Sequence, residues 1–299
     1  MLFTNYLLRR RVQSSKKLKG KELLKNDLVQ MTKEEKVLGM IDKRKIGLEI
    51  GPGHAPLAPK KDGFNVQIID YMNKEQLIKA YTSHKGNIEN IEEVDFVWNG
   101  QSYAKLTGKT NYYNWIIASH LIEHTPDLIS FLKECEEVLN EDGILSLVVP
   151  DIRYHFDYFR PITGISKVID AYMNKNTLQT PGTVAEFLLY LSKRGNQVAW
   201  QEGCKEEFSL VHDHTDAYNT MQRVINYGVY SDSHAWSFTP TSFRLLIQDL
   251  NNLKFISFRE IAFFPTSGSE FYITLGKKGA GFSQNRLDAL KTIKEEISF

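Results

Sequence analysis

Apolar residues occur in two kinds of pattern along this chain, and their alternation predicts the order of strands and helices. Short apolar runs predict five buried strands, at 46–50, 64–70, 94–98, 113–119 and 144–149. Apolar residues three or four positions apart predict helices at 21–45, 74–81 and 126–140. Strands and helices that alternate in this way are typical of a doubly wound, mostly parallel sheet.

After residue 150 the pattern changes, because 151–240 is rich in Tyr, His and Asn and holds separate helix-like pieces such as 183–193. A helix at 241–253 and two strands at 254–264 and 270–276 follow, and the five-residue link between the strands requires an antiparallel hairpin. We therefore predict a seven-stranded sheet that ends in an antiparallel hairpin. The predicted parts are an N-terminal helical extension (1–45), the sheet core (46–150), an inserted cap (151–240) and the completion of the sheet with a C-terminal tail (241–299).

Composition adds the class of protein. Of the 299 residues, 42% are hydrophobic and 24% are charged, which is near the globular average and excludes a disordered chain. The two cysteines, Cys135 and Cys204, are too few for a disulfide scaffold and favour a reducing compartment. The first apolar stretch stops at Leu8, before the basic residues, which is the reverse of a secretory signal. We expect a cytoplasmic protein.

The formal net charge of +1 argues against a general nucleic-acid coat protein, but the charge is unevenly distributed. Residues 1–25 hold eight Lys and Arg against one Glu, a net charge of +7, which leaves −6 for the rest. Such a segment is typical of a solvated arm. Its apolar residues before the Arg triplet also suit a peripheral contact with an anionic membrane. The protein would then lie at the inner face of that membrane. Nucleic-acid binding is the least favoured of the three interpretations.

A glycine loop follows the first predicted strand, in the sequence Leu48-Glu49-Ile50-Gly51-Pro52-Gly53. Glycines allow the backbone to turn sharply and to approach a ligand closely. The second strand ends at Asp70, where a carboxylate can accept hydrogen bonds from both hydroxyls of a ribose. The alternative is a structural turn with a solvated Asp. The third glycine of a dinucleotide-binding fingerprint is absent, since His-Ala-Pro follows Gly53.

These motifs resemble the class I S-adenosylmethionine-dependent methyltransferases, which have a Rossmann-like sheet. The chain resembles most closely the type 11 methyltransferases, of the kind found among bacterial surface-glycan genes. Three segments carry this closer similarity: Ala118-Ser-His-Leu-Ile-Glu-His-Thr-Pro-Asp127, Glu137-Val-Leu-Asn-Glu-Asp-Gly143 and Val149-Pro-Asp-Ile-Arg-Tyr154. The resemblance covers about 46–153 and, more loosely, 241–277. It implies an enzyme with S-adenosylmethionine as cofactor.

Carried over to this sequence, the resemblance implies a role for each residue around the cofactor. Glu49, Gly51 and Gly53 would surround its methionine part, and Asp70 would hold the ribose. Tyr71 or Met72 would lie against the adenine, and Asp95 would face the adenine amino group. Ser119 and His120 would close the site. One departure is that Pro56 and Pro59 disfavour the helix that usually follows the glycine loop. We expect that helix to be shortened or displaced.

The substrate chemistry needs further residues. Methyl transfer displaces a sulfonium leaving group, so the protein chiefly aligns the nucleophile, and an oxygen nucleophile also needs a base. The candidates follow the fourth and fifth strands, because ligands of such sheets bind at the carboxyl ends of the strands. We favour His234 as the base, with Asp151 and His155 behind it. His124 could also contact the site, but a residue at the entry of a helix that binds backbone groups is an equally good explanation for it.

Two further features bear on ligands. The segment 151–160 mixes acids, arginines and aromatic residues, which suits a sugar or a phosphate-bearing glycan, although a helix with an aromatic core side is the alternative. His212, His214 and His234 can be interpreted as a metal cluster, but no Cys or His framework supports it, so we expect no metal site. The sequence thus predicts O-methylation of a sugar or glycan intermediate. The alternatives are a non-catalytic scaffold with this fold, a small-molecule N-methyltransferase and, more distantly, a nicotinamide dehydrogenase.

Overall fold

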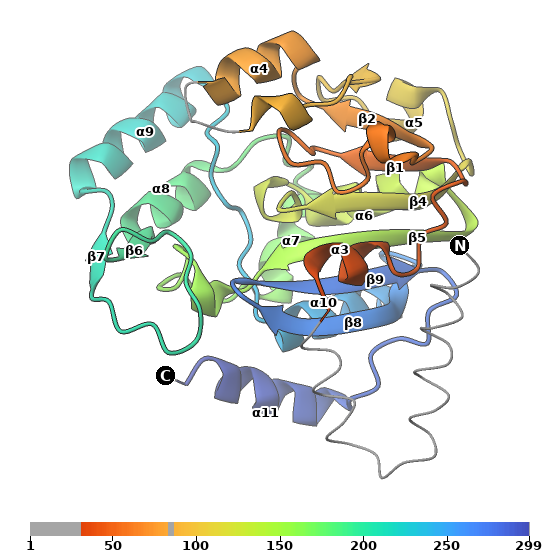
Figure 1. The fold of residues 1–299 in the computed structure, drawn as a ribbon. Helices are drawn as coiled ribbons and strands as arrows, with labels where there is room; N and C mark the ends of the chain where they lie inside the picture. Colours follow the sequence, from red (N-terminus) through yellow and green to blue (C-terminus); the bar gives the residue numbers. More distant parts are fainter. Residues whose placement is uncertain (1–30, 83–86, 299) are drawn as a thin grey trace.

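The computed structural model describes residues 31–82 and 87–298 (Figure 1). The basic segment 1–25 and the first part of the helix predicted at 21–45 lie outside the described residues. The described part of that prediction holds one short helix, α3 (Lys33–Leu38), which begins at a capping box formed by Thr32 and Glu35.

A seven-stranded sheet forms the centre of the molecule, with the strand order β3-β2-β1-β4-β5-β9-β8. Its strands are β1 (Gly47–Ile50), β2 (Val66–Asp70), β3 (Phe96–Val97), β4 (Tyr113–Ser119), β5 (Leu139–Pro150), β8 (Arg259–Ser267) and β9 (Glu270–Gly276). The first five run parallel, whereas β9 is antiparallel to both β5 and β8. The prediction of a mostly parallel sheet ending in an antiparallel hairpin is confirmed.

Helices cover the two faces of the sheet unequally. One face packs against α6 (Leu128–Val138), α7 (Ile165–Met173) and α10 (Pro240–Asn252), which bury strand residues such as Ile116 and Leu147. The opposite face carries Trp115 and Val148 and packs against the short helix α3 (Figure 1). The remaining α-helices are α4 (Lys74–Thr82), α5 (Tyr103–Thr107), α8 (Pro181–Tyr190), α9 (His214–Tyr227) and α11 (Arg286–Glu296).

The segment predicted as a cap contributes to two different parts of the structure. Its first helix, α7, belongs to the main core, since Val168 and Ala171 pack with the sheet residues. Helices α8 and α9 form a separate apolar cluster around Val184, Phe187 and Val224. A two-stranded ribbon, β6 (Ser192–Arg194) with β7 (Phe208–Leu210), adjoins them. This second part lies beyond the carboxyl ends of the parallel strands (Figure 1).

Two boundaries differ from the sequence prediction. Helix α6 ends at Val138 and β5 begins at once, so Asp142-Gly143, whose composition is typical of a turn between a helix and a strand, lies within the strand. The ladder with β4 shifts register there, since Tyr113 pairs with Leu139 but Trp115 pairs with Ile144, and a bulge absorbs the additional residues. The hairpin strands come closer together than predicted, because β8 continues to Ser267. None of the described helices combines the length and apolar content needed to cross a lipid bilayer.

Candidate active site at the carboxyl edge of the sheet

The glycine loop and the end of β2 are joined by the carboxylate of Asp70. Gly53 donates its backbone N–H to Asp70 Oδ2 at 3.0 Å, and Tyr71 donates to Oδ1 at 2.8 Å. Asp70 is only 3% exposed, and burial raises its pKa while the backbone N–H groups of Gly53, Tyr71 and Met72 oppose that rise. A carboxylate has about four lone-pair sites, so Asp70 keeps acceptor capacity for a ligand hydroxyl beside the backbone N–H groups.

Both glycines of this loop are needed for its shape. Gly51 and Gly53 have φ values of 66° and 52°, in the left-handed region that favours glycine. A Cβ on Gly53 would lie 2.6 Å from Tyr81 Oη, and one on Gly51 would lie 3.0 Å from Leu121 Cδ1. The loop therefore brings bare backbone against the end of β2. This bare backbone and the Asp70 carboxylate fit the ribose and methionine parts of S-adenosylmethionine.

Glu49 has a different position from the one that the resemblance implies. Its carboxylate accepts hydrogen bonds from the N–H of Leu57 at 2.7 Å and of Ala58 at 3.2 Å. Burial raises the pKa of Glu49 to about 7, although these two N–H groups counteract the rise. Glu49 thus holds the segment between β1 and β2. That segment contains a single 3-10 turn, η2 (Lys60–Asp62), and no α-helix among residues 51–65, all of which the structure describes. The expectation that the prolines shorten or displace the helix after the glycine loop is confirmed.

The residues predicted to surround the adenine lie in two different places. Tyr71 is 56% exposed directly after Asp70, and Met72 is half-buried beside it. Asp95, in contrast, lies before β3, where its Oδ2 accepts from Lys60 Nζ at 2.7 Å and from the N–H of Ile68 at 2.8 Å. Those bonds hold Asp95 away from the carboxyl end of β3. The residue at that end is Trp98, whose N–H donates to the carbonyl of Asp70 at 2.8 Å, and whose role the sequence did not indicate.

Ser119 and His120 lie at the carboxyl end of β4, as expected. His120 has a φ of 49°, and its ring lies between two glutamates, with Nε2 2.5 Å from Glu270 Oε2 and Nδ1 3.5 Å from Glu123 Oε1. Burial favours the neutral imidazole, but the two carboxylates outweigh it and raise the pKa of His120 to about 9. His120 is therefore a cation at neutral pH, next to the glycine loop that Leu121 contacts.

One long connection crosses this edge of the sheet. We call residues 228–239, between α9 and α10, the strap (Figure 1). The backbone N–H of Ala235 donates to the carbonyl of Glu123 at 2.6 Å. His124 Nδ1 lies 2.7 Å from Asp232 Oδ1, which also accepts from Tyr230 Oη at 3.0 Å. These bonds fix the strap to the 3-10 turn η4 (Ile122–His124) that follows β4.

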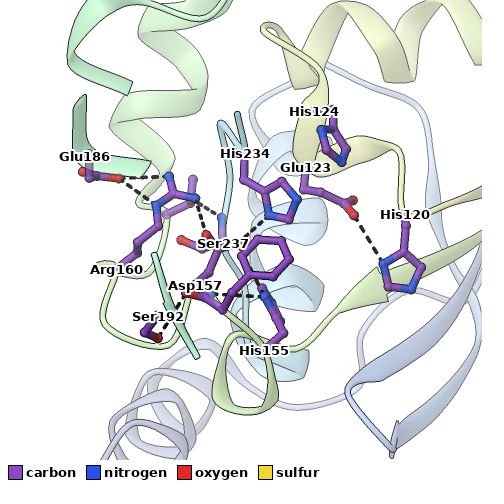
Figure 2. Close-up of polar contacts among 12 residues, drawn as sticks. His120, Glu123, His124, His155, Asp157, Arg160, Glu186, Ser192, His234 and Ser237 are labelled. Atoms are coloured by element: carbon purple, nitrogen blue, oxygen red, sulfur yellow. Dashed lines mark hydrogen bonds and ion pairs between the residues drawn. The ribbon is translucent and has the colours of Figure 1, made fainter. Parts of the chain in front are cut away.

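His234, the favoured base, lies on the strap and is paired with a carboxylate. Its Nδ1 is 2.5 Å from Asp157 Oδ2, and Arg160 donates to the other oxygen of Asp157 at 3.0 Å (Figure 2). Although burial opposes its ionisation, Asp157 has a pKa below its usual value because His234, His155 and Arg160 surround it. An ionised Asp157 makes Nδ1 of His234 the donor, and the lone pair then lies on Nε2.

The other two base candidates lie in less suitable surroundings. Asp151 is buried and forms a two-point ion pair with Arg153, at 2.9 and 2.5 Å, besides accepting from Thr266. Both oxygens of Asp151 are thus occupied by neighbouring donors, and Asp151 stabilises the turn after β5. Burial lowers the pKa of His155 to about 4, and its Nε2 is enclosed without a hydrogen-bond partner among the described residues. His155 nevertheless lies beside His234, with the ring centroids 6.1 Å apart.

The histidines near α9 do not join this group. His212 and His214 lie at the beginning of that helix, where His212 Nδ1 is 3.3 Å from Asp216 Oδ2. The described residues contain two clusters with the geometry of metal ligands, and both include His234 but neither His212 nor His214. Sequence reasoning missed Asp157, Asp232, Glu123 and Glu270 as members of the site, because each meets its histidine only in the folded chain.

Comparison with known proteins identifies the fold family. A family model described as a methyltransferase domain matches residues 30–251. A methyltransferase of Aquifex aeolicus described as SAM-dependent is 12% identical, with a TM-score of 0.39 over 86% of this chain and 98% of that one. A Methanosarcina mazei structure, also described as SAM-dependent, is 15% identical, with a TM-score of 0.39 over 80% of this chain and 95% of that one.

Other matches are shorter or absent. A structure from Galdieria sulphuraria is 22% identical, with a TM-score of 0.28, over 42% of this chain and 45% of its own length. No functionally curated protein matches the chain. The assignment rests on the family model, which covers most of the chain and includes the glycine loop, Asp70 and His234. The chain therefore belongs to the class I methyltransferases, for which S-adenosylmethionine is the expected cofactor.

Proposed function

We propose that this protein methylates a hydroxyl group of a sugar or glycan intermediate, with His234 as the general base. The observation that carries this proposal is the contact between His234, on the strap, and Asp157, which follows the turn after β5. Asp157 fixes the tautomer of the imidazole, and the free Nε2 can accept the proton of an attacking hydroxyl. An alcohol has a high pKa, so it gains more from such a base than an amine that is already neutral.

The bound cofactor supplies an electrophilic methyl group on a sulfonium. Gly51, Gly53 and Asp70 are the residues that would hold it, and the cation of His120 lies at the same edge of the sheet. The protein's own contribution is then to align the acceptor and to take its proton. Because the expected helix after the glycine loop is missing, no helix N-terminus is available there for the cofactor carboxylate, and the charged His120 is suited to replace it.

Exposed aromatic residues at this edge support a polar acceptor with an extended ring. Tyr71 and Tyr230 are each 56% exposed, and the pKa of each is raised by partial burial and then by a carboxylate, that of Asp70 at Tyr71 and that of Asp232 at Tyr230. Such surfaces can pack against the apolar face of a sugar while the neighbouring His124 and Asp232 bind its hydroxyls. Two other hollows, one lined by Arg244 and Glu260 and one by Arg153 and Tyr158, include neither Asp70 nor His234.

The test is methyl transfer from labelled S-adenosylmethionine to a panel of sugars, nucleotide sugars and glycan extracts, with small amines alongside. We expect labelled product from a hydroxyl acceptor, and we expect His234→Gln to lose it while S-adenosylhomocysteine still binds. Full activity of His234→Gln on an amine would favour the N-methyltransferase alternative. Cofactor binding with no transfer to any fraction would favour the scaffold alternative.

A further inference from the structure

Glu123, His124 and His234 come together where the strap crosses η4. One potential ligand atom from each lies within 4.8 Å of those of the other two. The imidazoles of His124 and His234 are 4.5 Å apart, with an angle of 84° between their planes. Figure 2 shows these three side chains on one side of the cluster, opposite Arg160.

Both imidazoles are oriented by carboxylates in the same sense. His124 uses Nδ1 to contact Asp232 at 2.7 Å, and His234 uses Nδ1 to contact Asp157 at 2.5 Å. Because Nδ1 of each ring faces a carboxylate, Nε2 is the nitrogen of each imidazole that is left to bind a ligand. A carboxylate behind the distal nitrogen is the usual arrangement of histidines that bind a metal through the other nitrogen.

Glu123 provides the third group. It is only 1% exposed, and its Oε2 is buried without a hydrogen-bond partner among the described residues. Its Oε1 lies 3.5 Å from His120 Nδ1, so only Oε2 lacks a partner in the described part of the chain. A buried carboxylate oxygen without a partner is unfavourable, and a bound cation would satisfy it.

From this geometry we propose that Glu123, His124 and His234 form a binding site for a divalent transition-metal ion, with Zn²⁺ as the best match to two imidazoles and one carboxylate. Three protein ligands leave a fourth position open for water or a substrate oxygen. The neighbouring group of His155, Asp157 and His234 is less suitable, because both oxygens of Asp157 already have partners in Arg160 and His234, whereas Glu123 Oε2 has none among the described residues.

Metal binding does not depend on the proposed function, but it affects it. The ion would take the lone pair of His234 Nε2 that the proposed base uses. If the proposed function holds, saturating Zn²⁺ therefore inhibits O-methylation. Binding itself is measured without any acceptor, so failure of the metal site and failure of the proposed function have separate readouts.

The experiment is calorimetric titration of the chelator-treated full-length protein with Zn²⁺, followed by Co²⁺ absorption spectra of the same variants. We expect one ion per chain, with binding lost in Glu123→Gln and in His124→Gln and weakened about 10–100-fold in Asp232→Asn, since Asp232 orients a ligand. His212→Gln is the matched control, because it removes an exposed histidine that also pairs with an aspartate but lies outside the cluster.

Binding of S-adenosylhomocysteine and the melting temperature are measured in every variant, so that lost folding is distinguished from lost metal. The proposal is wrong if the wild-type protein takes up less than half an ion per chain. It is also wrong if folded Glu123→Gln and His124→Gln both bind the metal as the wild type does, or if His212→Gln weakens binding as much as they do.

Discussion

His234 Nδ1 and Asp157 Oδ2 lie 2.5 Å apart in a buried contact between two segments that are 77 positions apart in the chain. Asp157 follows the turn after β5, and His234 lies on the strap that leads back to α10. The contact fixes the strap over the carboxyl edge of the sheet, and it also decides which imidazole nitrogen can accept a proton.

Replacing Asp157 by Asn tests this relationship. The amide does not stabilise the imidazolium that forms when His234 takes a proton, so we expect kcat to fall about 10²–10⁴-fold. The affinity for S-adenosylhomocysteine stays the same, because Asp157 contacts no residue of the glycine loop. The control is Glu186→Gln, which removes a carboxylate that pairs with Arg160 and Lys167 and leaves the contact between His234 and Asp157 in place. A kcat within threefold of the wild type in Asp157→Asn would exclude His234 as an oriented base.

Replacing two glycines of similar conformation, one inside the glycine loop and one outside it, should have different effects on stability and on cofactor binding. Gly53 and Gly108 have φ values of 52° and 67°, but a Cβ on Gly108 meets nothing within 4 Å, whereas one on Gly53 meets Tyr81 Oη. We expect Gly108→Ala to cost about 1–2 kcal/mol of unfolding free energy from the backbone alone. Gly53→Ala should cost more and also weaken cofactor binding. Urea unfolding and calorimetry compare the two, and equal effects on both quantities would contradict the close approach.

The buried Glu49 predicts a pH dependence of stability. Its pKa is raised by burial to about 7 from a usual value of 4.5, so the folded state holds the proton over a range where the unfolded state releases it. This group's contribution to stability is complete below pH 4.5 and is lost as the pH rises to about 7. Between pH 5 and pH 8 we expect the wild type to lose about 2–3 kcal/mol that Glu49→Gln does not lose. Urea unfolding at both pH values measures the difference, and parallel losses in the two proteins would exclude it.

Local patterns were sufficient to predict most of the sheet. Strands and helices repeat their apolar spacing within a few residues, so β2, β4, α6 and the final hairpin were predicted close to their observed positions. The glycine loop and Asp70 were found for the same reason, because both lie directly at strand ends. The end of α6 was misplaced, since Asp142-Gly143 has the composition of a turn but forms a bulge whose shape depends on pairing with β4.

The polar contacts of the site were less predictable. His234 was chosen as the base, but its partner Asp157 belongs to a segment that we interpreted as a substrate surface. Asp95 was assigned from the family resemblance, and only the fold shows that Lys60 binds it before β3. Asp151 was chosen because it follows the fifth strand, but its local pairing with Arg153, two positions later, occupies its carboxylate. Contacts between distant segments depend on tertiary structure, which a single sequence does not encode in a local pattern.

The most direct test of the account is calorimetric titration of S-adenosylhomocysteine into the wild-type protein and into Asp70→Ala. Asp70 both holds Gly53 and offers an acceptor for a ribose hydroxyl, so we expect clear binding by the wild type and a loss of about 10–100-fold or more in the variant. Asp62→Ala, which changes an exposed acid of η2, is the control and should bind as the wild type does. No binding by the wild type, or unchanged affinity in folded Asp70→Ala, would contradict the assignment of this edge as the cofactor site.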